Sequence, residues 1–280
     1  MSVYKKEDAH TAEGSFFIAT RGTERSEYEI TVSDAWISVD KEKGTVNTAD
    51  PFIRVRVAIN KDMLEKKAES YTAKGEISVK TGCGKVRIEV STLVYDENDD
   101  VFTEENGMVV INAAHFDSLK DGKCGSFKVL KKLGRNEDAI KLFPVDRSIE
   151  DTADAPVAKY SFRITDGGEY RIIFITEAVN PYLHGKGIDI TYSVNDGDVK
   201  TLRVVDEHFE AGSSYEWGQG VLKHVREPEA EAAFEAGINS LSFYGMRVEN
   251  VLERILIVKK DVKLPDVYLG PAESIGKQYV

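Results

Sequence analysis

Alternation of apolar and polar residues is the feature that most limits how this chain can fold. Near the N-terminus it runs through SEYEITVS, FIRVRVAI, GEISVK and KVRIEV. Successive side chains of a strand point to opposite faces, so the pattern predicts strands with one buried and one solvated face. The TGCG stretch between the last two runs predicts a hairpin. Residues 14–95 are therefore expected to form an antiparallel, immunoglobulin-like β-sandwich, with one short helical piece at 61–70.

The rest of the chain also consists of short strand patterns separated by Gly, Asn, Asp and Pro. They are MVVINAAHF, GSFKVLKKL, DAIKLFPV, VAKYSFRI, EYRIIFITEA, GIDITYSV, KTLRVVD, GVLKHVRE, NSLSFYGM and ERILIVKK. Strands at this spacing favour a jelly-roll sandwich. The stretch 228–237, PEAEAAFEAG, predicts two helical turns that end at Gly237. The acidic stretch 96–100 lacks alternation and marks a domain boundary, which gives domains 1–97 and 98–280.

The predicted fold class is all-β, with two β-sandwich domains. Strands do not alternate with long helices, which excludes a nucleotide-binding α/β sheet and a (β/α)₈ barrel. The formal net charge of -11 argues against nucleic acid and membrane as partners. No apolar run reaches the roughly 18 residues of a membrane span, and MSVYKKEDAH lacks the apolar core of a signal peptide.

Recognisable motifs for catalysis or cofactor binding are missing from the sequence. The Gly-x-Gly pairs and Gly-Lys pairs lack the neighbours that phosphate-binding loops need, and they are interpreted as turns. His115 is expected to pack within a strand, and Cys83 and Cys124 to be unpaired. We expect no catalytic residue, no metal site and no cofactor. A structural calcium ion stays an alternative, although DENDD (96–100) lacks the loop glycine and NDGD (195–198) is better explained as a hairpin turn.

Two loops carry candidate carbohydrate-binding residues. NPYLHGKG (180–187) contains Tyr182 and His184, and SSYEWGQG (213–220) contains Tyr215 and Trp217. Aromatic rings can stack on the faces of sugar rings while polar groups bind the hydroxyls. The alternative for Trp217, which precedes the expected strand GVLKHV, is that it closes the end of the core. Paired carboxylates could hydrolyse a glycosidic bond, but 48 acidic residues give no means of choosing a pair.

An ordered set of motifs in the second half points to one family. The motifs are MVVINAAHF, KLGRNEDAIKLFP, NPYLHGKGIDITYSVNDGD, YEWGQGVL, INSLSFYGMRVENVLERILI and VYLGPAES. Together they resemble the C-terminal β-sandwich domain of glycoside hydrolase family 115, the xylan α-1,2-glucuronidases, although Ala272 replaces a proline of that pattern. Residues 15–95 are similar to the immunoglobulin-like module that can precede this domain, and DAWISVDKEKGTV is similar to BACON-type modules.

The resemblance implies a jelly-roll domain similar to carbohydrate-binding modules, in an exported bacterial protein. In that family the chemistry belongs to a barrel-containing region that precedes these modules and has no counterpart in this chain. The resemblance also implies a structured ending, in which Tyr268 and Leu269 pack back onto the sandwich and Gly270-Pro271 makes the bend.

Three functions follow as expectations. The first is a non-catalytic accessory region that supports the catalytic domain of a glycoside hydrolase, with a homodimer as a further expectation. The second is a carbohydrate-binding module for glucuronoxylan or a related plant polysaccharide. The third and least favoured is an independent hydrolase, because no catalytic site can be assembled from the motifs.

Overall fold

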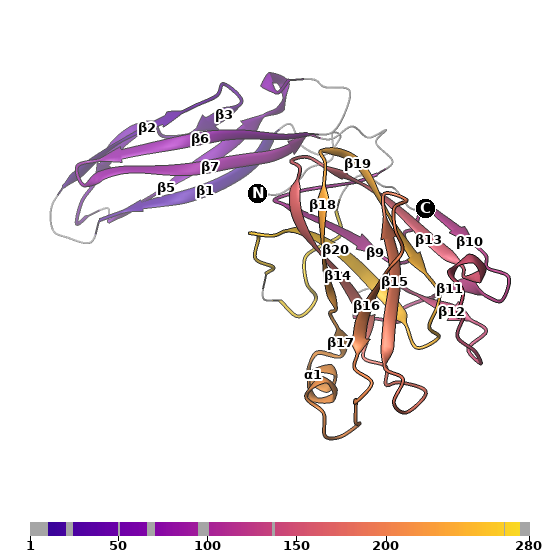
Figure 1. Ribbon diagram of the computed structural model, residues 1–280. Coiled ribbons are helices and arrows are strands. Elements are labelled where there is room, and N and C mark those ends of the chain that lie inside the picture. The colour runs from indigo at the N-terminus through magenta and orange to yellow at the C-terminus, as the bar shows by residue number, and fades with distance from the viewer. Residues whose placement is uncertain are drawn as a thin grey trace. The chain divides into compact units, whose positions relative to one another are not determined.

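The computed structural model describes residues 11–20, 25–49, 51–65, 71–94, 101–135, 138–265 and 267–274. The chain divides into two compact units, Met1–Asp99 and Asp100–Val280, and each is a β-sandwich, which confirms the all-β fold class (Figure 1). The DENDD stretch at 96–100, where the domain boundary and a calcium loop were considered, lies outside the described residues. Among the described residues, no helix is long and apolar enough to cross a membrane.

The N-terminal unit has two sheets around one core. Their strand orders are β1-β5-β3 and β4-β2-β6-β7. The inward-facing core includes Trp36, Ile37, Ile59 and Ile77. The strands are β1 (Thr11–Ala19), β2 (Ser26–Val32), β3 (Ile37–Val39), β4 (Lys43–Val46), β5 (Phe52–Asn60), β6 (Tyr71–Thr81) and β7 (Gly84–Val94).

The predicted hairpin between GEISVK and KVRIEV is confirmed. Thr81 pairs with Gly84, so that Gly82 and Cys83 form the turn between β6 and β7. Cys83 and Cys124 are both exposed and free, as expected. The helical piece expected at 61–70 is only a 3₁₀ turn at Lys61–Met63 where it is described. Its remainder, 66–70, lies outside the described residues.

The C-terminal unit packs a six-stranded sheet against a seven-stranded sheet. The first has the path β10-β13-β19-β15-β16 with β8 beside β13, and the second has the path β11-β12-β20-β14-β17 with β18 beside β14 and β9 beside β20. The strands are β8 (Phe102–Thr103), β9 (Met108–Asn112), β10 (Ser118–Lys120), β11 (Ser126–Leu130), β12 (Ala139–Phe143), β13 (Val157–Ile164), β14 (Gly168–Glu177), β15 (Ile188–Val194), β16 (Lys200–Val205), β17 (Val225–Arg226), β18 (Glu229–Phe234), β19 (Gly237–Tyr244) and β20 (Val251–Lys259).

Aromatic side chains fill the space between these two sheets. Phe162 and Tyr170 lie edge-on to Phe234, with ring centroids 5.3 and 5.7 Å apart. Phe174 contacts Tyr192 at 5.2 Å. Edge-to-face pairs at these distances contribute beyond the burial of their area, so the loops at the ends of the sandwich are supported by a well-packed core.

Two secondary-structure predictions in this unit are wrong. The stretch 228–237 forms no helix: its residues Glu229–Phe234 are strand β18, because they pair antiparallel with β14 and place Ala230 and Ala232 against the core. Pairing and burial outweigh the helix propensity of Ala and Glu in this place. GVLKHVRE is not a strand: its first half belongs to the α-helix α1 (Tyr215–Lys223), and only Val225–Arg226 pairs, as β17. The NDGD turn is confirmed, since Asn195 and Asp196 have φ of 52° and 53° between β15 and β16.

The last described residues of the chain are bound to the sandwich, but only in part as the resemblance implied. We name 262–274, without residue 266, the closing segment. Tyr268 and Leu269 stay 56% and 53% exposed, whereas their carbonyl oxygens accept hydrogen bonds from Arg135 and Arg254. Gly270, with φ of 69°, ends a turn that starts at Val267.

The last described residues of the closing segment bind strand β9. Ser274 exchanges two hydrogen bonds of 2.9 Å with the backbone of Val110. Glu273 accepts from the backbone of Asn112 at 2.6 Å and lies 2.9 Å from Nδ1 of His115. The Tyr268 ring lies 5.2 Å from the guanidinium of Arg135 and 6.5 Å from the ring of His224. Polar contacts and these ring contacts, rather than full burial of Tyr268 and Leu269, therefore hold the closing segment.

Candidate functional site

Helix α1 begins and ends at well-defined caps. The hydroxyl of Ser214 accepts from the backbone N–H of Trp217 at 3.3 Å, and His224 adopts the left-handed conformation at the C-cap, with φ of 62°. Capping by serine offsets the low helix propensity of Gly218 and Gly220. The helix and the 178–187 loop emerge at the same end of the C-terminal sandwich (Figure 1).

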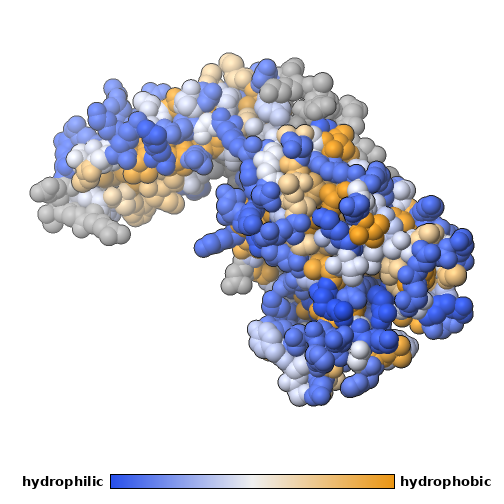
Figure 2. Space-filling view, viewed as in Figure 1, coloured by the Kyte–Doolittle hydropathy of each residue, from blue (hydrophilic) through white to orange (hydrophobic). Residues whose placement is uncertain are grey.

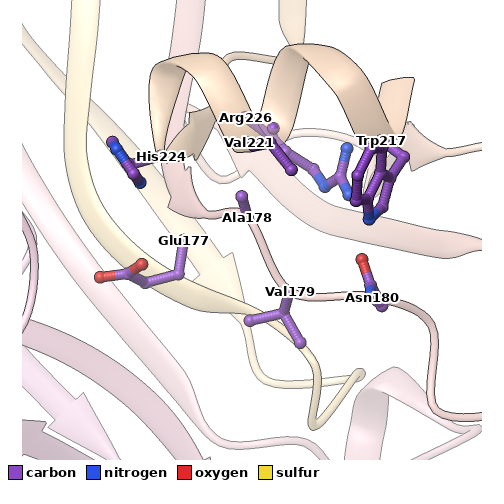
Figure 3. Close-up of a pocket in the computed structure, with 9 residues that line it drawn as sticks. Glu177, Ala178, Val179, Asn180, Trp217, Val221, His224 and Arg226 are labelled. Carbon is purple, nitrogen blue, oxygen red and sulfur yellow. The ribbon is translucent and has the colours of Figure 1, made fainter. Parts of the chain in front are cut away.

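A hollow with a volume of about 400 Å³ lies between α1 and the chain that leaves β14. We name it the α1 hollow. Arg226, Trp217 and Asn180 lie toward one end of it, and Glu177 and His224 toward the other (Figure 3). Between them the wall is formed by Ala178, Val179, Val221 and Gly220.

Arg226 is the buried cation of the hollow, with an exposed fraction of 8%. Its Nη1 donates to the carbonyl oxygen of Glu216 at 3.1 Å, and its guanidinium lies 5.3 Å from the ring centroid of Phe209. A side chain at Gly220 would come within 3.6 Å of this guanidinium and 3.2 Å of Ala178. Burial lowers the pKa of Arg226, while Glu216 acts in the opposite direction.

Glu177 is the acid of the hollow. Burial raises its pKa, and the nearby carboxylate of Glu253 raises it further, against the opposing effect of Arg135 and His224. Glu253 itself is buried, and its own pKa is raised by that burial. The two acids therefore hold their protons more tightly than exposed glutamates do.

The structure brings only one of the four predicted sugar-binding residues into the α1 hollow. Trp217 is half-buried and packs against a cluster of Ile188, Val205 and Phe209, so it both lines the hollow and closes the end of the core. Tyr215 is 77% exposed and lines a second hollow on α1, with a volume of about 330 Å³.

Tyr182 and His184 line neither of these two hollows. Tyr182 is 71% exposed and His184 is exposed. The backbone N–H of Tyr182 donates to Glu249 at 3.3 Å, which fixes the start of the loop.

The sequence did not single out Arg226, Glu177 or Asn180. Arg226 and Glu177 sat at the ends of expected strands, where a charged residue is ordinary. Only the unexpected helix places Trp217 opposite the loop that follows β14, so no spacing in the sequence relates these residues. Among the described residues, no group of three or more His, Cys, Asp or Glu side chains could hold a metal ion.

These features define a modular protein of two β-sandwiches, the second with a ligand-sized hollow among its loops. The match to known families makes this more specific. Residues 101–273 match the glycosyl hydrolase family 115 C-terminal domain, and the chain belongs to this family. A comparison with curated proteins found no match.

Several solved structures are similar to part of the chain. A family GH115 4-O-methyl-α-glucuronidase, BtGH115A, with specificity for decorated arabinogalactans, aligns with a TM-score of 0.43 and 14% identity over 56% of this chain and 18% of its own. A Podospora anserina GH26-CBM35 mannanase aligns at 0.38 and 13% over 57% and 29% of the two chains. A family 35 carbohydrate-binding module from Clostridium thermocellum aligns at 0.35 and 11% over 54% and 98%. The matched part is thus a small fraction of the glucuronidase.

Proposed function

We propose that this chain is a non-catalytic accessory region of a family 115 glycoside hydrolase and that it supports the catalytic domain. The observation that carries this proposal is the family match, because 101–273 correspond to the domain at the C-terminus of these enzymes. The α1 hollow agrees with it. Among the described residues that line the hollow, Glu177 is the one carboxyl group, whereas glycoside hydrolysis ordinarily needs two that flank the bond.

A contact face for the catalytic domain is available in the N-terminal unit. Phe17 on β1 and Phe52 on β5 are each 62% exposed, and their rings form an edge-on pair with centroids 6.3 Å apart. Adjacent exposed aromatic side chains are typical anchors of protein interfaces. On the face of the C-terminal unit that Figure 2 shows, hydrophilic side chains predominate and apolar ones lie in small, separate groups.

The accessory role is tested by mixing this chain with a family 115 enzyme that lacks its own C-terminal modules and measuring association by analytical ultracentrifugation. We expect a complex, weakened by Phe17→Ser and by Phe52→Ser. Val86→Ser is the matched control, because Val86 is 59% exposed but lies on β7 in the other sheet. Absence of a complex, or turnover of a glucuronoxylan oligosaccharide by this chain alone, would refute the proposal.

A carbohydrate-binding role is the second candidate. The observation in its favour is that Tyr182 and Tyr215, which are 71% and 77% exposed, lie on two segments at the same end of the sandwich (Figure 1). Exposed rings of this kind can stack on sugar rings. We expect glucuronoxylan in a native gel to retard the chain, and Tyr182→Ala and Tyr215→Ala to reduce the retardation at an unchanged melting temperature. Equal mobility with and without the polysaccharide would exclude this role.

A further inference from the structure

Arg226 differs from three other arginines of the C-terminal unit that also have a buried Nε, because no acid lies close to it. Four arginines have a buried Nε without a hydrogen-bond partner in the described structure: Arg135, Arg171, Arg226 and Arg247. In three of them another guanidinium nitrogen lies near a carboxylate. The pairs are Arg135–Glu227 at 3.9 Å, Arg171–Glu229 at 3.3 Å and Arg247–Glu249 at 3.5 Å. For Arg226 no described carboxylate lies within the 4.0 Å of an ion pair.

A buried cation with no carboxylate in ion-pair contact is costly, because the charge of Glu216, which lies farther away, offsets the loss of hydration only weakly. The hydrogen bond to the carbonyl of Glu216 and the contact with Phe209 compensate only in part. They also fix the guanidinium in place. An anion that entered the α1 hollow would meet a cation that is already oriented and partly dehydrated.

The walls of the hollow define the rest of the ligand. Arg226 and Trp217 line the same end of the hollow, and Asn180 lines it from the loop that follows β14 (Figure 3). An indole favours a ring face, and an amide can both donate to and accept from hydroxyl groups. The volume of about 400 Å³ falls within the usual range of small-molecule sites.

We propose that the α1 hollow binds a small ring compound that carries a carboxylate. Arg226 holds the carboxylate, Trp217 covers one face of the ring, and Asn180 binds a ring substituent. An acidic sugar residue and an aromatic acid both have this chemistry. The proposal is independent of the accessory role. The residues of the hollow lie in the C-terminal unit, whereas Phe17 and Phe52 lie in the N-terminal unit, so either proposal can fail alone.

The first test compares three probes on the full chain by isothermal titration calorimetry. D-glucuronate is the sugar acid, benzoate is the aromatic acid, and D-glucose is the neutral ring. We expect at least one of the acids to bind, and D-glucose to bind much more weakly than D-glucuronate. A preference for D-glucuronate assigns the site to sugar acids, and comparable binding of both acids assigns it to ring carboxylates in general. Binding of neither acid, or of D-glucose as tightly as D-glucuronate, overturns the proposal.

Arg226→Gln should weaken binding by about 30-fold or more, the scale expected when one partner of a buried charge pair is removed. Arg171→Gln is the matched control. Arg171 also donates to a backbone carbonyl, that of Val262, but it has Glu229 as its acid and lies outside the α1 hollow. If both variants bind the probe as the unchanged chain does, Arg226 is not the anchor.

A second pair of variants avoids any dependence on the folding of Arg226→Gln. Val221 lines the hollow and is 50% exposed, so the helix should accept other side chains there. Val221→Glu adds an internal carboxylate that competes for Arg226, whereas Val221→Gln adds a side chain of similar size without charge. We expect Val221→Glu to bind at least about tenfold more weakly than Val221→Gln. Equal affinities for the two variants would contradict the proposal.

Discussion

Two irregular segments of the C-terminal unit are attached to the sandwich in similar ways, with different consequences. The α1 segment, 206–224, and the closing segment both have backbone carbonyl oxygens that accept from buried arginines. Arg226 serves the first, and Arg254 serves the second. Nη1 and Nη2 of Arg254 donate to the carbonyl oxygens of Leu269 and Pro271, at 3.0 and 2.6 Å. Arg226 has one such bond and a hollow beside it.

The difference shows that a buried arginine bonded to backbone carbonyls can either hold a segment in place or remain available to a ligand. An arginine whose donors are engaged by the chain stabilises a segment and has little capacity for a ligand. An arginine with spare donors next to a hollow keeps that capacity, at some cost in stability. The comparison predicts that substitutions under the closing segment act on stability, and that substitutions around α1 act on binding as well.

The largest effect is expected for Arg254→Ala. It leaves two backbone carbonyls without their charged donor and frees the closing segment from β20, which should cost about 3 kcal/mol, since hydrogen bonds to charged groups are worth roughly 1.5–3 kcal/mol each. Urea unfolding followed by tryptophan fluorescence measures this in a chain that carries Trp36→Phe, because Trp217 is then the one tryptophan that reports. Arg147→Ala, at a side chain that is 63% exposed, is the control. A cost for Arg254→Ala no larger than that of the control would show that the closing segment does not contribute to the stability of the C-terminal unit.

A smaller loss is expected for Trp217→Ala. The indole packs against Ile188, Val205 and Phe209 but is only half-buried, so the cost should be about 2 kcal/mol, below the 3–5 kcal/mol of a fully buried tryptophan. The same variant should weaken binding of a ring carboxylate. Tyr215→Ala, at a residue that is 77% exposed, should change stability by less than about 0.5 kcal/mol. Melting curves and titrations of both variants check this pair, and an unchanged stability for Trp217→Ala would refute its packing role.

The contrast between the segments also shows what the sequence could and could not predict. The period-two pattern identified the paired strands because each face of a sheet has its own environment. It failed at α1, where a loop and the strand GVLKHVRE were expected and the structure has a helix capped by Ser214. It failed at β18, where Glu and Ala suited a helix and pairing with β14 decided otherwise.

The candidate site was harder to predict than the fold. Trp217 was identified by its residue type, but Arg226 and Glu177 lie about 50 residues apart in the chain, and no local pattern joins them. The motif VYLGPAES indicated a specified ending, and its Glu273 and Ser274 side chains bind strand β9. Tyr268 and Leu269 instead contribute backbone carbonyls, which every residue has, and contacts of this kind leave no trace in the side-chain pattern.

The smallest predicted effect concerns Glu253, which lies between the two segments in sequence and contacts the chain near the closing segment. Its Oε2 accepts from the backbone N–H of Arg135 at 2.8 Å, whereas its Oε1 is buried without a partner in the described structure. Burial raises its pKa in the folded state above the value in the unfolded chain. The folded state then binds the proton more tightly, so this group stabilises the protein below its unfolded pKa, and that contribution is lost as pH rises through the folded pKa.

Glu253→Gln removes this titration while keeping an oxygen for the N–H of Arg135. The unfolding free energy of the variant should therefore fall less than that of the unchanged chain between about pH 4 and pH 8, by roughly 1 kcal/mol. Urea unfolding at several pH values measures the difference, and Glu150→Gln, at an exposed acid, should follow the unchanged chain. Parallel pH profiles for Glu253→Gln and the unchanged chain would mean that Glu253 does not bind its proton more tightly in the fold. Glu253 would then be as fully charged as the acids on the surface. The difference between the closing segment and the α1 hollow would then consist only of the spare donors of Arg226.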